Sequence, residues 1–156
     1  MITEDYVPFE TAKLLKEKGF NEKCKLVWIL DKANDSEDTD GIYKLSAECF
    51  TVGRSFVDND DIMSVCKYNG WNEYSKEAFL CPTLQMATKW LQEVHNLSIG
   101  IKCSIHGFFC AIVHIVKDEN GRIIDVEDSV DWATTYCETS EDAVNKAIVY
   151  ALIYLI

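Results

Sequence analysis

The most constraining feature of this 156-residue chain is an amphipathic segment at its centre, residues 81–96. Its apolar side chains recur at positions i, i+3, i+7 and i+10, the spacing of one stripe along an α-helix. Pro82 suits a first helical position, and Asn96 tolerates the left-handed conformation that often ends a helix. The stripe consists of Leu84, Ala87, Leu91 and Val94, widened by Met86 and Trp90. Because such a stripe is not stable alone, the helix needs an apolar sheet to pack against.

The residues that follow predict this sheet. Segment 97–104 has the composition of a strand, and segment 108–116 is apolar on both alternating faces, which indicates a central strand covered on both sides or nearly so. Residues 118–121, Asp-Glu-Asn-Gly, are typical of a hairpin turn. Segment 122–127 alternates apolar and acidic residues, as a half-exposed strand does.

A last helix is predicted over residues 140–154, with Thr139 as its N-cap and Asp142 at the third helical position. It is apolar over most of its circumference, so it should be deeply packed or should also face a partner, such as a second copy of the chain. Its main stripe is Val144, Ala147, Ile148, Ala151 and Leu155, extended by Val149 and Ile153. The order helix, strand, strand, strand, helix predicts an α+β fold with a mainly antiparallel sheet.

The first half of the chain is less regular. Residues 8–18 predict a helix that Gly19 ends, and segments 25–30 and 42–52 predict strands. Residues 58–74 carry no clear period and are interpreted as irregular, which makes residues 31–75 an acidic, loop-rich insertion. The chain length favours one domain over residues 1–156.

Composition excludes several classes of function. A net charge of −11 argues against direct nucleic-acid binding and against anionic membranes, because both require clustered Lys and Arg. Seven cysteines without a C-x-x-C pair favour reduced thiols in a cytoplasmic protein. The N-terminus lacks the pattern of a signal peptide, and the longest apolar run, residues 147–156, is too short to span a bilayer.

Three segments together resemble a family of small proteins without established activity, encoded in prophages and other mobile DNA of gut Bacteroides-type bacteria. These segments are residues 4–20, 81–91 and 139–156, which cover about half the chain. The acidic stretch 31–61 departs from that pattern. The resemblance implies an intracellular accessory protein of a mobile element, and it transfers no catalytic or cofactor-binding residue.

Two shorter resemblances concern topology. From Pro82 onward the element order is similar to that of a double-stranded-RNA-binding domain, whose last helix begins with basic residues. Here that helix begins with Glu141 and Asp142, and Lys146 is its nearby basic residue. Residues 139–148 are similar to the strand-to-helix segment of HicB-like antitoxins.

Cys103, His106, Cys110 and His114 spell a pattern suggestive of zinc. On a strand, residues four apart lie roughly 13 Å from one another, whereas tetrahedral zinc requires ligands within about 4 Å. One ion cannot collect all four unless the strand breaks, so no metal site is predicted from them. Two of them with a distant ligand remain an alternative.

Cys81 is the one candidate for catalysis, because a cysteine before a helix N-terminus can be held as a thiolate. The base that it would need is absent nearby, since His95 lies about 21 Å away at the other end of the helix. The alternative is a buried or capping cysteine, and this is favoured.

Two further features have the composition of binding sites. Ser36, Asp38, Asp40 and Gly41 mimic the start of a calcium-binding loop, but its twelfth position is Ala47, so a solvated acidic loop is favoured. The tryptophans could line a pocket, although core positions are more common for this residue. They are Trp28, Trp71, Trp90 and Trp132.

The sequence therefore predicts a non-catalytic module that binds or regulates another protein, without a cofactor. A first alternative is an acidic mimic of nucleic acid that occupies a DNA-binding protein, with carboxylates on one face at phosphate spacing. A second is a cysteine-dependent enzyme that uses Cys81.

Overall fold

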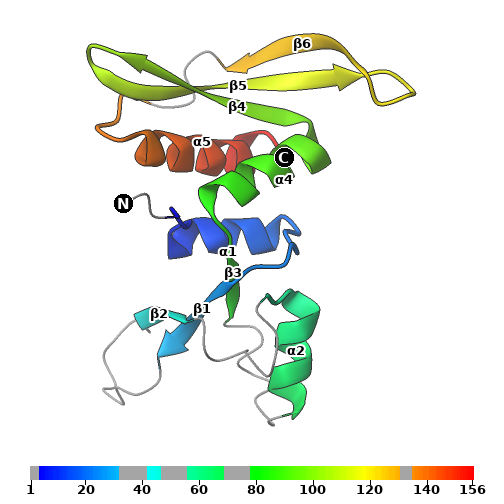
Figure 1. Ribbon diagram of the computed structural model, residues 1–156, viewed down its shortest axis with the longest axis vertical. Helices are drawn as coiled ribbons and strands as arrows, with labels where there is room; N and C mark the ends of the chain where they lie inside the picture. The colour runs from blue at the N-terminus through cyan, green and yellow to red at the C-terminus, as the bar shows by residue number, and fades with distance from the viewer. Residues whose placement is uncertain (1–3, 32–41, 47–55, 69–77, 131–134) are drawn as a thin grey trace. The chain divides into compact units, whose positions relative to one another are not determined.

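The computed structural model describes residues 4–31, 42–46, 56–68, 78–130 and 135–156 (Figure 1). Contacts divide the chain into two compact units. Residues 8–82 form one, called here the N-terminal unit, and residues 1–7 with 83–156 form the other, the C-terminal unit. The single domain expected from chain length stays a prediction. No helix in the described ranges is long and apolar enough to cross a bilayer.

The C-terminal unit confirms the predicted α+β order. It contains α4 (Leu84–His95), β4 (Leu97–Ser104), β5 (Gly107–Lys117), β6 (Ile123–Val130) and α5 (Ser140–Tyr154). The strands pair antiparallel in the order β4-β5-β6, and α4 and α5 lie against the same face of this sheet (Figure 1). The predicted central position of β5 and the hairpin turn after it are both confirmed.

The strand register decides which side chains face the helices. Ile99 pairs with Ile112 and Ile101 pairs with Cys110, so all four lie on the helix-covered face. Cys110 and Ile112 are fully buried there. The helices contribute a buried row to the same core: Ala87, Leu91, Ala147, Ile148, Ala151 and Leu152.

The central helix differs in detail from its prediction. It begins at Leu84, because Thr83 is the N-cap and its Oγ1 accepts a hydrogen bond from the backbone N–H of Met86 at 3.2 Å. Cys81 and Pro82 therefore precede the helix. Asn96 ends it in the left-handed conformation, as predicted. Val94 was expected in the buried stripe, but it is 56% exposed and Trp90 is buried in its place.

The last helix matches its prediction closely. The Thr139 hydroxyl accepts a hydrogen bond from the N–H of Asp142 at 3.1 Å, which is the expected cap. The buried set includes Ala143 and Leu152, which the predicted stripe omitted, and Ile153 is half-exposed. Packing on β4 and β5 buries most of this apolar circumference, so α5 needs no second copy to account for its composition.

The turn between β4 and β5 depends on one glycine. Gly107 has a φ of +120°, and a Cβ there would collide with the carbonyl oxygen of Cys137. That oxygen accepts the N–H of Phe108 at 2.9 Å, and the Cys137 N–H bonds back to the Phe108 carbonyl at 2.8 Å. This bridge attaches the segment before α5 to the sheet.

We expect Gly107→Ala to destabilise the chain by about 3 kcal/mol, because it adds left-handed strain and breaks bridge hydrogen bonds. Gly100→Ala in β4 is the matched control, since a Cβ at Gly100 meets nothing within 4 Å. Urea unfolding followed by circular dichroism measures both variants. Equal midpoints would show that the Gly107 conformation is not required.

The N-terminal unit contains α1 (Phe9–Glu17), β1 (Leu26–Asp31), β2 (Ile42–Ser46), α2 (Asn59–Tyr68) and β3 (Phe79–Cys81). Its strands pair antiparallel in the order β2-β1-β3. Aromatic rings join α1 to this sheet. The ring of Phe9 packs edge-on against those of Phe79 and Trp28, with ring centroids 5.4 Å and 6.2 Å apart, respectively. The predicted first helix and the first two strands are present, and the rest of the predicted second strand lies outside the described residues.

The prediction of irregular structure over residues 58–74 is wrong where the structure describes it, because α2 occupies residues 59–68. Asp58 and Asp61 cap one another at its start. The Asp61 N–H donates to Asp58 Oδ1 at 2.9 Å, and the Asp58 N–H donates to Asp61 Oδ2 at 3.2 Å. This is a reciprocal capping box built from two aspartates, and it anchors a helix that buries Ile62.

Candidate functional site

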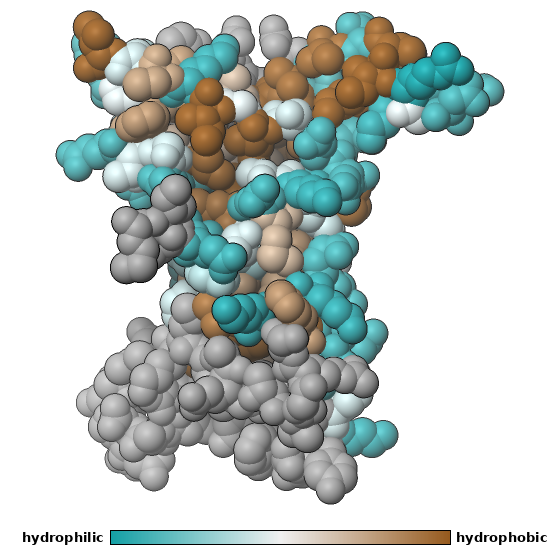
Figure 2. Space-filling model, viewed as in Figure 1, coloured by the Kyte–Doolittle hydropathy of each residue, from teal (hydrophilic) through white to brown (hydrophobic). Residues whose placement is uncertain are grey.

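The β4-β5-β6 sheet presents an apolar face away from α4 and α5. In β5, Phe109 and Val113 alternate with the helix-facing residues and are half-buried on this side. In β6, Val126 pairs with Ile115 and Ile123 pairs with Lys117, which places them on the same side. Val126 is 50% and Ile123 is 59% exposed, and Figure 2 shows apolar atoms gathered over this hairpin.

Tyr136 extends this apolar face toward the β4–β5 turn. The centroid of its ring lies 5.5 Å from the ring centroids of both Phe109 and His106. We call the set Phe109, Val113, Ile123, Val126 and Tyr136 the outer sheet face. Among the described helices, α4 and α5 pack on the opposite side, yet Ala111 and Ile115 on the outer side of β5 are buried. The expectation that β5 is covered on both sides stays a prediction.

One of the two edges of this sheet, at β6, is protected against pairing with another strand. The pairing of β6 with β5 shifts register twice, between Ile112 and Val113 and between Val116 and Lys117. In addition, Asp125 Oδ1 accepts the backbone N–H of Val126 at 2.8 Å. Bulges and side-chain capping both disfavour strand addition at the β6 edge.

Two lysines lie on the same side of the sheet as the outer sheet face. Lys102 pairs with Phe109 and Lys117 pairs with Ile123, which places both on the outer side. Asp125 pairs with Val116 and Glu127 pairs with His114, so these exposed carboxylates lie on the opposite side. Arg122, in the hairpin turn, approaches Asp118 at 3.9 Å. The outer sheet face is therefore apolar with basic residues beside it.

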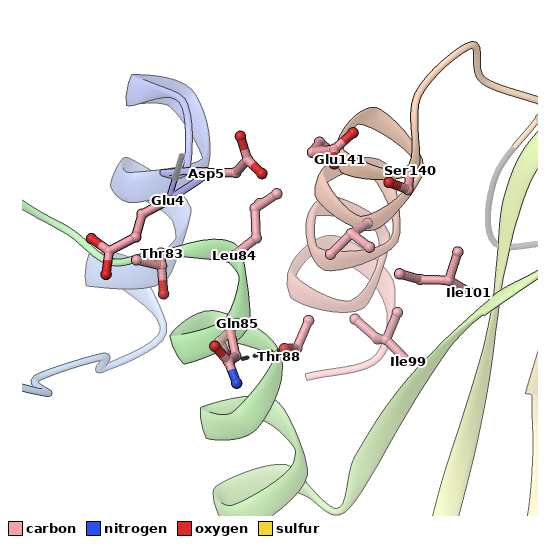
Figure 3. Close-up of a pocket in the computed structure, with 11 residues that line it drawn as sticks. Glu4, Asp5, Thr83, Leu84, Gln85, Thr88, Ile99, Ile101, Ser140 and Glu141 are labelled. Atoms are coloured by element: carbon pink, nitrogen blue, oxygen red, sulfur yellow. Dashed lines mark hydrogen bonds between the residues drawn. The ribbon is translucent and has the colours of Figure 1, made fainter. Parts of the chain in front are cut away.

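A pocket of about 480 Å³ lies on the other side of the C-terminal unit (Figure 3). It opens between the first turns of α4 and α5 and reaches β4. Its lining comes from the N-terminal segment, the two helices with the cap of α4, and β4: Glu4, Asp5, Thr83, Leu84, Gln85, Thr88, Ile99, Ile101, Ser140, Glu141 and Val144. The N-terminal segment is held there because the Asp5 carbonyl accepts the Leu84 N–H at 2.8 Å.

Cys81 lies at the end of β3 in the N-terminal unit and is fully buried. Burial raises its thiol pKa to about 12, and a hydrogen bond with Trp28 opposes this only in part. Cys24, also buried, has a thiol pKa of about 12, raised by burial and then by proximity to Cys81. The raised pKa favours the protonated thiol near neutral pH, which opposes a role for Cys81 as a nucleophile, and the cysteine-enzyme alternative stays a prediction.

The four residues of the zinc-like pattern are not brought together as a ligand set. Cys103 is exposed in β4, His106 lies in the turn, and Cys110 and His114 are four apart along β5. Burial raises the Cys110 pKa to about 11, with a further rise from Cys137. Within the described ranges, no group of three or more His, Cys, Asp or Glu residues could hold a metal ion.

The structure describes only some of the other predicted site residues. Ser36, Asp38, Asp40, Gly41 and Ala47 lie outside the described residues, as do Trp71 and Trp132. Trp28 packs against Phe9, and Trp90 is buried with its ring 4.7 Å from that of His95. Neither of these two lines the pocket.

Comparison with known proteins returned no matching family model, no matching curated protein and no matching solved structure. The resemblance to mobile-element proteins stays a prediction, and so does the nucleic-acid mimic. The geometry of the described residues is therefore the basis for the function proposed below.

Proposed function

We propose that the chain is a non-catalytic protein-binding module that docks a partner on its outer sheet face. The observation that carries the proposal is a row of apolar side chains along β5 and β6, from Tyr136 and Phe109 at one end to Val126 and Ile123 at the other, on the side of the sheet opposite α4 and α5. Apolar side chains contiguous on one surface are typical of protein interfaces. Isolated exposed residues would not carry this argument.

Charge indicates the kind of partner. Lys102 and Lys117 lie beside the outer sheet face, whereas the chain as a whole carries a net charge of −11. Two copies placed face to face would bring these lysines together, which disfavours association. The surface therefore fits a different protein whose apolar patch is bordered by Asp or Glu.

Val126→Lys tests the proposal, because a charged lysine within the patch opposes the apolar contact with a partner. We expect it to weaken partner binding at least about tenfold, equivalent to about 1.4 kcal/mol. Val94→Lys is the matched control: Val94 is another half-exposed valine, but it lies on α4, on the helix side of the sheet. Melting curves establish that both variants fold.

The measurement is affinity capture from the source cells on immobilised chain, quantified by mass spectrometry and repeated with the purified captured protein by calorimetry. Support requires a protein that binds the wild type and Val94→Lys alike and loses affinity for Val126→Lys. A captured protein that binds all three equally would show that the outer sheet face is not the docking surface. Capture of nothing beyond the empty support would contradict the module itself.

A further inference from the structure

The pocket between α4 and α5 has an apolar interior with a polar opening. Leu84, Val144, Ile99 and Ile101 supply its apolar walls. Ile101 is 53% exposed although it stands on the helix-covered face of β4, because the helices begin beside it rather than over it. An isoleucine left half-exposed on the core side of a sheet has contact surface available for a ligand's hydrocarbon chain.

The opening is acidic. Asp5 and Glu141 lie on opposite sides of it in Figure 3, whereas the Glu4 side chain points away from them, toward Thr83. Glu4 accepts the Tyr6 hydroxyl at 2.6 Å, whereas Asp5 and Glu141 have no ion-pair partner among the described residues. Among the described residues that line the pocket there is no Lys, Arg or His. Nothing in the described lining neutralises these carboxylates.

Two helix N-termini face the same opening and favour anions, so the two effects must be compared. Each N-terminus contributes about half a positive elementary charge, together about one. Their first N–H groups are also partly engaged, because Thr83 and Thr139 accept from Met86 and Asp142. The carboxylates of Asp5 and Glu141 therefore exceed the two dipoles, and the opening keeps about one negative charge.

We propose that this pocket binds an aliphatic cation, with its hydrocarbon chain against Ile99 and Ile101 and its ammonium or guanidinium group between Asp5 and Glu141. The volume of about 480 Å³ is that of a small-molecule site, larger than a bare ion requires. The same chemistry is offered by a free amine and by a lysine or arginine side chain of a peptide. The pocket lies across the sheet from the outer sheet face, so this inference is independent of the proposed function.

The test is a titration of the full ¹⁵N-labelled chain, followed by NMR, with three probes of matched shape: n-pentylamine, pentan-1-ol and pentanoate. We expect saturable shifts at Ile101 and Thr88 with the amine, and a Kd of about 1 mM for this six-atom probe. The alcohol should bind at least about tenfold more weakly, and pentanoate should not bind. Equal binding of the alcohol, tighter binding of pentanoate, or no saturable shift with the amine would each overturn the proposal.

Variants locate the cation. Glu141→Gln should weaken amine binding about threefold, and Ile101→Lys should abolish it by placing an ammonium group in the pocket. Glu127→Gln removes an exposed carboxylate from β6, away from the pocket, and should leave the Kd unchanged. If all three variants bound the amine with the Kd of the wild type, the amine would bind elsewhere, and the proposed site would be contradicted. Comparing n-pentylamine with N-acetyl-lysine amide then separates the two sources, because a peptide site binds the capped lysine more tightly and a free-amine site does not.

Discussion

Replacing Ile148 with alanine is expected to remove about 4 kcal/mol of folding free energy, the largest stability effect among these predictions. Ile148 is fully buried in α5, which packs on both β4 and β5. Truncation removes apolar contacts and leaves a cavity that the surrounding sheet cannot easily fill. Urea denaturation followed by circular dichroism, analysed at constant slope, measures the change.

Ile153→Ala is the matched control, because it makes the same substitution one and a half turns further along the same helix. Ile153 is 49% exposed, so we expect a loss below about 1 kcal/mol. The gain in helix propensity from isoleucine to alanine is common to both variants and cancels in the comparison. Similar losses at both positions would show that α5 does not present the Ile148 side to the sheet.

Native alkylation of Cys81 is expected to be about a thousandfold slower than that of an ordinary exposed thiol at pH 8. Burial raises its pKa from 9.0 to about 12, so the thiolate fraction falls by about three powers of ten. Cys24 should behave alike for the same reason. Timed iodoacetamide labelling with peptide mass spectrometry gives the rate at each cysteine, and exposed Cys103 is the internal control. Labelling of Cys81 as fast as Cys103 would restore the cysteine-enzyme hypothesis.

The same pKa values predict alkaline destabilisation. A thiol whose pKa is higher in the folded than in the unfolded state binds its proton more tightly when folded. Its contribution to stability is complete below about pH 9 and is lost as pH rises toward 11 or 12. Each such thiol contributes a slope of about 1.4 kcal/mol per pH unit in that range. Cys81→Ala should reduce the slope of unfolding free energy against pH by that amount, which urea unfolding at a series of pH values measures, and an unchanged slope would contradict the raised pKa.

Local signals in the sequence were sufficient for the elements of the C-terminal unit. The limits of β4 and the cap of α5 agree with the structure because β composition and a threonine before a helix act within a few residues. The same kind of signal was present for α2, where Asp58 and Asp61 occupy the two ends of a capping box. It was missed because weak apolar periodicity was read as irregular structure.

Local signals in the sequence did not predict the candidate binding surfaces. Alternation along β5 indicated that both its faces are apolar, but it could not indicate which face the helices cover. The outer sheet face follows from the packing of α4 and α5 on the other side. Likewise, the sequence did not show that Val94 is exposed and Trp90 is buried. An apolar stripe does not fix the exact rotation of a helix about its axis, because the packing partners determine it.

The amino-acid sequence by itself determined the α-β-β-β-α order of the C-terminal unit and its acidic character, since caps, periodicity and charge are properties of neighbouring residues. Only the tertiary structure decided that Cys81 is buried by pairing with Leu26 in β1, and that Asp5 and Glu141 meet at one pocket. Those contacts join residues 55 and 136 positions apart. The physical reason is that burial and electrostatic environment depend on which distant segments pack together, and no local pattern specifies that choice.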